Sequence, residues 1–307
     1  MNNKELAISI LLSALLLLTS FSVIAAEEPV IPFNKANITH FNQAPNLEQK
    51  VKGGELPPLK ERLPDEPLVV NPTNKVGKYG GTITLGASSK SMWSPAGQMM
   101  AEYVLRLDRF KPLSGKTVPN IGKSWEFKDD GKIMHLHLRE GMKWSDGEPF
   151  TADDIMFAYN HVLRNKELHP VPPEKALPSQ LTDVEKKGKY EIAIHLQEPY
   201  PRFDEFLAQD RLFYGEFSKN PKHFMKQVHP AFVEKKKLKN LATSVGLERW
   251  TDYYQRIQDS LVHPHEYKYV RPTLRPYIAV KRTVAYIIME RNPYFPFVDT
   301  EGNQLPY

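Results

Sequence analysis

The sequence predicts a mixed α/β fold in which strands and helices follow one another without a regular βαβ alternation. Residues 132–139 and 190–199 alternate apolar and polar side chains with the period of a half-buried strand. Residues 221–260 are expected to be helical in pieces, broken at His229-Pro230 and at Gly246. No internal repeat accompanies these elements, which argues against a repeat architecture.

The most informative segment of the chain begins with the strand over 132–139. Its alternation directs Met134, Leu136 and Leu138 toward the core, and Gly141 ends it. The neighbouring positions between these apolar residues are then left on the other face of the strand.

A tight turn and a capped helix follow this strand. Ser145-Asp146-Gly147 is a turn signal, because Asp bonds its own backbone and glycine tolerates positive φ. Thr151 is a suitable N-cap, and the carboxylates of Asp153 and Asp154 favour the positive end of the helix dipole. Apolar positions then recur at helical spacing: Ile155, Tyr159, Val162 and Leu163.

Further elements are predicted on both sides of this unit. Residues 80–88 form the first clear strand, and Asp129-Asp130-Gly131 is expected to close a hairpin. A short amphipathic helix is expected over 202–213, and one strand or a pair of strands over 277–293.

The first residues indicate export. Met1 to Ala26 combines a short polar start, an apolar run and small residues before Glu27, as in a secretory signal peptide cleaved near Ala25 or Ala26. An uncleaved membrane anchor is the alternative. The chain contains no cysteine, which excludes disulfides, thiol chemistry and a lipid-modified cysteine. We therefore expect a soluble, periplasmic mature protein.

The charge balance excludes few partners. The 307 residues carry a formal net charge of +5 and a pI near 9.0. The densest basic run, residues 234–239, is expected to be the solvated face of a helix. No aromatic interleaving or recognition motif accompanies it, so nucleic-acid binding is not expected.

Residues 27–75 are rich in Pro, Asn and Glu. This composition favours an N-terminal arm with few regular elements, which either wraps the domain or stays mobile.

Two groups of side chains resemble metal ligands. His135 and His137 lie two apart on a strand and point the same way, and His263, His265 and Glu266 form a second group. Zinc needs three or four ligands held by further hydrogen bonds, and nothing in the sequence ties the two groups together. An exposed strand face also explains the first pair, so no metal and no cofactor are expected.

Catalytic residues are not expected either. Asp129-Asp130 and Asp153-Asp154 resemble acid/base pairs, but adjacent residues on a turn or a helix start diverge, which favours turn and capping roles. The chain lacks a nucleophile elbow, a P-loop and a dinucleotide-binding glycine motif.

A long ordered pattern relates the chain to a known family. It runs over residues 118–163, "VPNIGKSWEFKDDGKIMHLHLREGMKWSDGEPFTADDIMFAYNHVL", and three shorter stretches accompany it: "ERLPDEPLVV", "GKYGGTITL" and "ERNPYFPFVDTEGNQLPY". These segments resemble the peptide-type extracellular solute-binding proteins, the periplasmic receptors of ABC importers for oligopeptides, dipeptides and related solutes. The resemblance extends from about Glu61 to Tyr307.

The resemblance implies a type II periplasmic-binding-protein fold, whose two lobes close over a solute. Ligand binding would shift an open-to-closed equilibrium, and the closed form would be recognised by membrane permease subunits. The chain would supply lobe one, incomplete, because family members are much longer and continue into a second lobe. The chain departs from the family pattern at Arg275, Ile278 and Pro296.

The expected organisation has four parts: a signal peptide at 1–26, the arm at 27–75, the N-terminal part of lobe one at 76–290, and the start of a crossover to lobe two at 291–307. Two other classes stay open beside a working receptor. One is a remnant that binds no solute, and the other is an exported hydrolase.

Loops that follow strands line the cleft in such folds. The residues expected to touch a peptide or other small solute are Ser88, Ser89, Trp93, Phe203, Arg211 and Tyr214. For Trp93 and Phe203, a role as core anchors is equally compatible with the sequence, because aromatic residues dominate both cores and pockets. The sequence does not name the solute.

Overall fold

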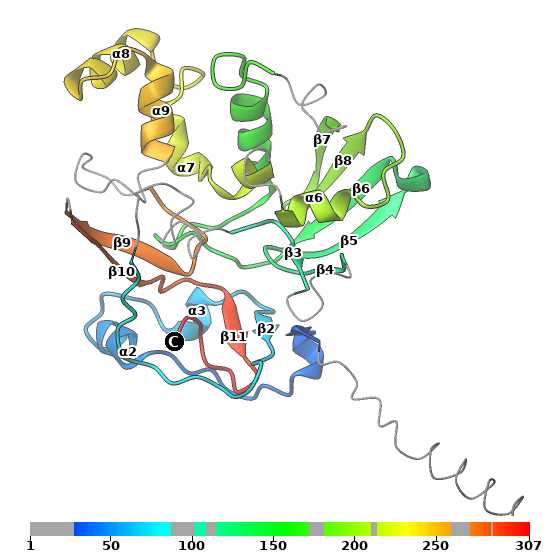
Figure 1. Ribbon diagram of the computed structural model, residues 1–307, viewed down its shortest axis with the longest axis vertical. Coiled ribbons are helices and arrows are strands. Elements are labelled where there is room, and N and C mark those ends of the chain that lie inside the picture. The colour runs from blue at the N-terminus through cyan, green and yellow to red at the C-terminus, as the bar shows by residue number, and fades with distance from the viewer. Residues whose placement is uncertain are drawn as a thin grey trace, which may run out of the picture.

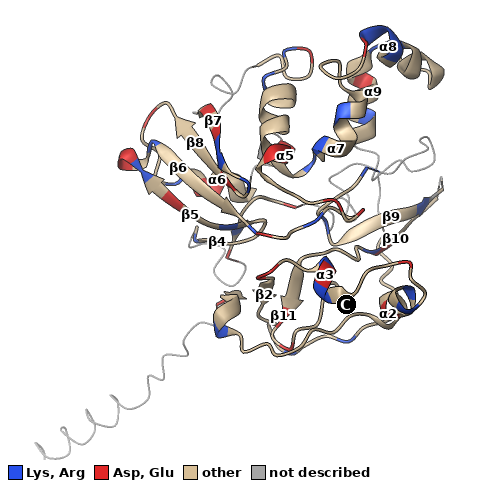
Figure 2. Cartoon of the chain, turned by 180° about the vertical axis from the view of Figure 1, so that it is seen from behind, with Lys and Arg blue, Asp and Glu red and all other residues tan. Residues whose placement is uncertain are grey.

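The computed structural model describes residues 28–86, 102–108, 115–171, 181–209, 214–258, 271–283 and 285–307. Figure 1 shows two layers of structure, with a small sheet and short helices at the bottom and a larger sheet with most of the helices above. The β9–β10 ribbon lies between them, and Figure 2 shows the same arrangement from behind. Within the described ranges, no helix combines the length and apolar character needed to cross a membrane.

The upper sheet has the order β5-β6-β8-β7 and is antiparallel throughout. Its strands are β5 (Gly122–Lys128), β6 (Ile133–Leu138), β7 (Leu181–Gly188) and β8 (Glu191–Leu196). Burial alternates strictly along β6, and Met134, Leu136 and Leu138 are its buried residues. The predicted strands over 132–139 and 190–199 are therefore confirmed.

Both predicted turns are also confirmed. The turn between β5 and β6 is η3 (Asp129–Gly131), where Asp129, Asp130 and Gly131 all have positive φ. The second turn closes at Gly147, whose N–H donates to the Trp144 carbonyl over 2.9 Å, while the Glu148 N–H donates to Asp146. Gly147 has φ 92°, which glycine adopts readily.

The helix that follows starts with a capping box. Thr151 accepts from the Asp153 N–H, and the Asp154 carboxylate accepts from the Thr151 N–H. Helix α5 (Ala152–Phe157) continues directly into η4 (Ala158–Leu163), which has π-helical hydrogen bonding. The four apolar positions expected on its inner face are all buried: Ile155, Tyr159, Val162 and Leu163.

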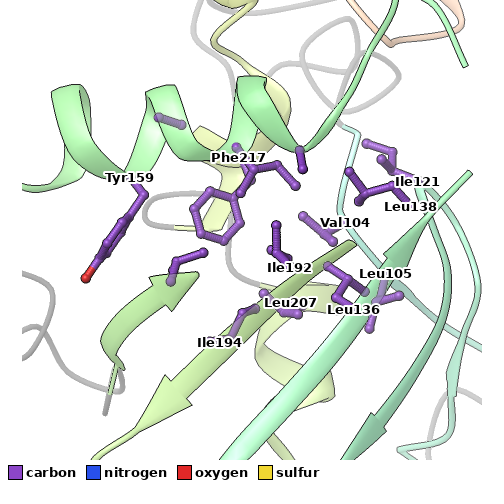
Figure 3. Close-up of a cluster of buried hydrophobic side chains, with 14 of the residues drawn as sticks. Val104, Leu105, Ile121, Leu136, Leu138, Tyr159, Ile192, Ile194, Leu207 and Phe217 are labelled. Atoms are coloured by element: carbon purple, nitrogen blue, oxygen red, sulfur yellow. The ribbon is translucent and has the colours of Figure 1, made fainter. Parts of the chain in front are cut away.

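This helix covers one face of the upper sheet, and the main core lies between them. Figure 3 shows Tyr159 and Phe217 above the strands, with Leu136, Ile192 and Ile194 facing them from the sheet. Helix α6 (Phe203–Gln209) contributes Phe203 and Leu207 to the same core, which confirms the amphipathic helix expected there. Two short strands flank this core, β3 (Arg106–Leu107) and β4 (Thr117–Val118), paired with each other.

A second core joins the remaining helices. It includes Phe157, Met225, Leu238, Trp250 and Tyr254. The segments are α7 (Lys222–Met225), η7 (Lys226–Val228), α8 (Lys235–Ser244) and α9 (Trp250–Gln258). The breaks at His229-Pro230 and Gly246 are as predicted, and so is the exposed basic face of α8.

His229 lies in this second core as a buried, neutral side chain. Its Nε2–H donates to the His161 carbonyl over 2.8 Å, and its Nδ1 accepts from the Ala231 N–H. Burial lowers the pKa of His229 to about 4, although the hydrogen bond to the His161 carbonyl and the charge of Glu167 oppose the shift. The folded protein therefore resists protonation of this ring in a range where the unfolded chain accepts a proton.

We expect the unfolding free energy to fall by up to roughly 3 kcal/mol as the pH drops from about 6.5 toward about 4. The sign follows because the unfolded chain binds more protons than the folded one across this window. Urea unfolding at successive pH values measures the slope. His229→Asn is expected to flatten it, whereas His40→Asn, at an exposed position, should keep it. Equal slopes in both variants would contradict the assignment.

The lower sheet has the order β1-β2-β11 and joins the two ends of the described chain. Strand β2 (Leu68–Val70) pairs antiparallel with β1 (Val30–Ile31) and parallel with β11 (Phe297–Asp299). The arm also contains η1 (Phe33–Lys35), α2 (Pro45–Lys52) and α3 (Leu59–Arg62). It is thus more regular than its composition suggested, and it packs against the C-terminal segment.

The ribbon consists of β9 (Tyr277–Arg282) and β10 (Ile287–Arg291), which confirms a strand pair rather than one strand. The strand predicted over 80–88 is wrong for residues 80–86, which form no strand. Ile83 and Leu85 are 74% and 49% exposed there. Alternation alone does not make a strand, because the backbone must also find a partner.

Candidate functional site

Four of the six predicted solute-contact residues lie outside the described residues: Ser88, Ser89, Trp93 and Arg211. The other two are Tyr214 and Phe203. Tyr214 is the first residue of η6 (Tyr214–Ser218), a turn of 3₁₀ helix.

Phe203 begins α6 and is fully buried in the main core. Its ring lies 6.5 Å from that of Tyr200 and 6.3 Å from that of Phe206. This is the core-anchor placement that the sequence left open for Phe203.

The predicted contact residues come from two segments, one with Ser88, Ser89 and Trp93 and the other with Arg211 and Tyr214. The described residues at the ends of these segments are held together. Ser218 Oγ donates to the Glu102 carbonyl over 2.8 Å, so η6 is bonded to the residue that follows 87–101. The Leu105 N–H donates to the Leu207 carbonyl over 3.3 Å, which joins the same region to α6. Segments separated by about a hundred positions in sequence therefore meet at one place in the fold.

A buried polar network occupies this place. We define it by eight residues, all with little or no solvent exposure: Glu102, Asn120, Glu216, Ser218, Asn220, Tyr254, Gln258 and Arg271. Buried polar side chains are costly unless they are hydrogen-bonded, so a network of this size fixes one arrangement of the segments that supply it.

The first half of the network centres on Glu102. Its carboxylate accepts from Asn120 Nδ2 over 2.6 Å and from Arg106 Nη2 over 3.1 Å. Burial raises the pKa of Glu102, while the Arg106 charge and the two hydrogen bonds oppose the shift.

The second half connects η6 to the end of α9. Asn220 Nδ2 donates to the Glu216 carboxylate over 2.8 Å, and its Oδ1 accepts from the Tyr254 hydroxyl over 2.8 Å. Arg271 donates to the Gln258 carbonyl over 2.6 Å and to the Lys219 carbonyl over 2.7 Å. Gln258 and Arg271 are the described residues on either side of 259–270, and both are thereby fixed to η6 and the residues that follow it.

We expect Glu102→Gln to change the pH dependence of stability. A carboxyl group with a raised folded pKa contributes stability at low pH, and this is lost as the pH rises through that pKa. The free energy of unfolding of the variant, relative to that of the native chain, should therefore be higher at pH 7 than near pH 4.5. Urea unfolding at both pH values measures this difference. Glu102→Ala should show the same pH dependence but a larger loss of stability at both pH values, because Asn120 Nδ2 then loses one of its two acceptors. A constant difference between Gln variant and native chain would contradict this.

The carboxylate pairs serve structure in the way the sequence suggested. Asp129 and Asp130 form the hairpin turn, and Asp154 completes the helix cap. His135 Nδ1 lies 2.9 Å from Glu191 across the sheet. In the part of the chain that the structure describes, no three His, Asp or Glu side chains are grouped to hold a metal ion. His263, His265 and Glu266 lie outside that part.

A surface pocket that the sequence did not point to lies between the arm and the C-terminal loop. It has a volume of about 250 Å³ and is lined by Asn37, Ile38, Thr39, His40, Asn42, Thr300 and Glu301. The Asn42–Asn303 bridge and the hydrogen bond between their side chains, 3.0 Å long, lie beside it. It is a feature of the lower layer, whereas the polar network belongs to the upper one.

Comparison with known proteins identifies the kind of fold that carries this network. Residues 116–262 match the family model of the bacterial extracellular solute-binding proteins, family 5 Middle. That range includes the whole upper sheet and the helices α5 to α9. Since the family consists of binding proteins, the match agrees with the structural roles found for the carboxylates.

Similar proteins extend the match over most of the chain. The periplasmic alpha-galactoside-binding protein of Rhizobium meliloti (strain 1021) is 31% identical over 85% of this chain and 37% of its own length. A solved oligopeptide-binding protein OppA is 34% identical, with a TM-score of 0.75 over 88% of this chain and 40% of that one. The periplasmic binding protein MelB of Agrobacterium fabrum C58, in complex with stachyose, is 26% identical with a TM-score of 0.66, covering 92% of this chain and 42% of its own.

The fold is therefore that of the type II periplasmic binding proteins, and the described residues form part of its first lobe. The chain spans about two fifths of the length of these similar proteins. The predicted resemblance to extracellular solute-binding proteins and the predicted α/β lobe are confirmed, whereas the solutes of the similar proteins include more than peptides.

Proposed function

We propose that the protein is the solute-binding component of an ABC importer, exported to the periplasm by a signal peptide at residues 1–26. The observation that carries the proposal is the similarity to periplasmic binding proteins over 85% and 88% of the chain. The turn and cap roles of the paired aspartates support binding over catalysis.

In this proposal the solute is bound by side chains from the two segments whose ends the polar network fixes. Ser88, Ser89 and Tyr214 would offer hydroxyl groups, Trp93 a stacking surface, and Arg211 a charge. Phe203, buried in the main core, would support these contact residues from below. Closure over the solute would shift the conformational equilibrium toward the form that membrane permease subunits recognise.

A peptide is the first candidate solute, and the 34% identity to OppA over 88% of the chain supports it. An alpha-galactoside oligosaccharide is the second candidate. The Rhizobium meliloti protein named for that ligand is 31% identical over 85% of the chain, and MelB was solved with stachyose. Arg211 suits a peptide carboxylate, whereas Trp93 suits the face of a sugar ring as well as an apolar side chain.

The 307 residues taken alone are expected to bind weakly. If they supply about half of the interaction free energy of a receptor with a micromolar Kd, the Kd becomes about 1 mM, because 1 μM and 1 mM correspond to −8.2 and −4.1 kcal/mol. Experiments on this chain should therefore use millimolar solute, at which binding still raises thermal stability.

The experiment is thermal unfolding of the mature chain with a pool of di- to pentapeptides or with stachyose, followed by chromatography of the solute. We expect one class to raise the melting temperature without being consumed, and Trp93→Ala to abolish the rise. Trp125→Ala, on the sheet, is the matched control. Products of hydrolysis would favour the exported hydrolase, and no rise with either class would favour the non-binding remnant.

A further inference from the structure

Helix α8 carries the densest basic surface of the described chain. We call Lys235, Lys236, Lys237 and Lys239 the lysine cluster, and all four are exposed. Figure 2 shows α8, blue over its first part, at the end of the molecule away from the β1-β2-β11 sheet. Residues 231–244 contain these four lysines and one acidic residue, Glu234, so their formal charge is +3 (four minus one).

The helix does not need these charges in order to fold. Three of the lysines occupy the first three positions of α8, at the positive end of its dipole, where cations are unfavourable. The first turn has no acidic residue, and the N-cap residue Glu234 makes no capping hydrogen bond. Buried Leu238 and Ala242 hold the helix against α9 instead. A sequence that violates a local rule in this way points to a use beyond folding.

Ion pairs within the described residues do not neutralise the charge of the lysine cluster. Lys235 pairs with Glu167 over 2.9 Å, but both side chains are more than half exposed, so solvent screens the pair. Lys236, Lys237 and Lys239 form no ion pair with any residue that the structure describes. Most of the charge therefore remains available to something outside this part of the chain.

An exposed aromatic ring lies next to the cluster in sequence. Phe232 is 48% exposed, three residues before Lys235. Its N–H donates to the His229 carbonyl over 3.0 Å, and its ring lies 4.9 Å from His161 and 5.8 Å from Phe157. The ring is thus held at the rim of the second core, although it is only half covered.

We propose that the lysine cluster and Phe232 dock the protein onto a bilayer surface rich in anionic phospholipid. Lysines are attracted to phosphate headgroups, and a half-exposed aromatic ring gains apolar contact at the boundary between headgroups and acyl chains. This combination favours a lipid surface over an acidic protein, because charge attraction alone gives no role to Phe232.

Sedimentation of the mature chain with vesicles tests the proposal. The vesicles are pure phosphatidylcholine, or phosphatidylcholine with an equal part of phosphatidylglycerol, at low and at high salt. We expect binding to the anionic vesicles alone, weakened by salt. Since each lysine near such a surface contributes roughly a fivefold factor, replacing all four by Gln should weaken binding by at least about a hundredfold. Phe232→Ser should weaken it by several-fold at both salt concentrations.

The matched control replaces Lys52, Lys60, Lys75 and Lys78 by Gln, four exposed lysines in or just after the arm, which changes the net charge equally. Circular dichroism verifies that both fourfold variants stay folded. Equal loss of binding in the two variants would overturn the proposal, because net charge alone would then govern. If the chain bound neither kind of vesicle, the proposal would also be overturned. Retention on an immobilised acidic polypeptide would then assign the cluster to an acidic protein surface.

Discussion

Trp144→Ala is expected to lower the free energy of unfolding by about 3–5 kcal/mol, the usual cost of removing a large buried aromatic side chain. Trp144 is fully buried in the main core, and its ring meets Phe150 edge-on at 5.5 Å. Its backbone also closes the turn, since its N–H donates to the Glu148 carbonyl over 2.8 Å. Urea unfolding followed by tryptophan fluorescence and circular dichroism measures the loss.

Asp146→Ala is the companion variant in the same turn. Its carboxylate accepts from the Glu148 N–H over 3.3 Å and lies 2.8 Å from His223 Nε2, both at a partly exposed site. The expected loss is about 1 kcal/mol, since a single net hydrogen bond contributes that much. Unfolding curves of both variants that coincide with the native curve would reject a structural role for residues 144–147.

Arg62→Met should cost roughly 3 kcal/mol, because several acceptors around a buried guanidinium lose this donor together. The buried Arg62 guanidinium donates to the carbonyls of Pro57, over 3.0 Å, and Pro293, and to the amide oxygens of Gln43 and Gln304. It therefore joins α3 to the segment that leads into β11. Burial lowers the pKa of Arg62, which reflects how far the charge is removed from water.

The control for Arg62 is Arg249→Met. Arg249 is exposed and pairs with Asp252 three residues along, so its loss should change stability by no more than about 0.5 kcal/mol. Guanidinium unfolding of both variants gives the comparison. If Arg62→Met matched Arg249→Met, the arm would be held to the C-terminal segment by something other than this side chain.

The parts of the fold that the sequence predicted well are those set by neighbouring residues. The alternation of β6, the turn at Gly147 and the Thr151 cap are each determined within a few positions. The strand expected at 80–88 failed because pairing depends on a partner far away in the chain. The arm shows the converse, since β2 exists by pairing with β11, more than two hundred residues later.

The candidate site was predictable to a smaller extent for the same reason. The sequence indicated segments that would contact solute, but not the network that fixes their described ends. Ser218 meets Glu102 across 116 positions, and Tyr254 meets Asn220 across 34. Polar residues such as Asn120 and Asn220 resemble ordinary loop residues in the sequence, and only their complete burial distinguishes them.

The central claim is that this chain is the solute-contacting part of a binding protein, and the indole N–H resonance of Trp93 tests it most directly. The chain has four tryptophans, so a heteronuclear spectrum gives four indole signals that single Trp→Phe variants assign. With millimolar peptide pool or stachyose, the account predicts a saturable shift of the Trp93 signal, while the signal of buried Trp144 stays fixed. A Trp93 signal that does not move with either solute class would contradict the account.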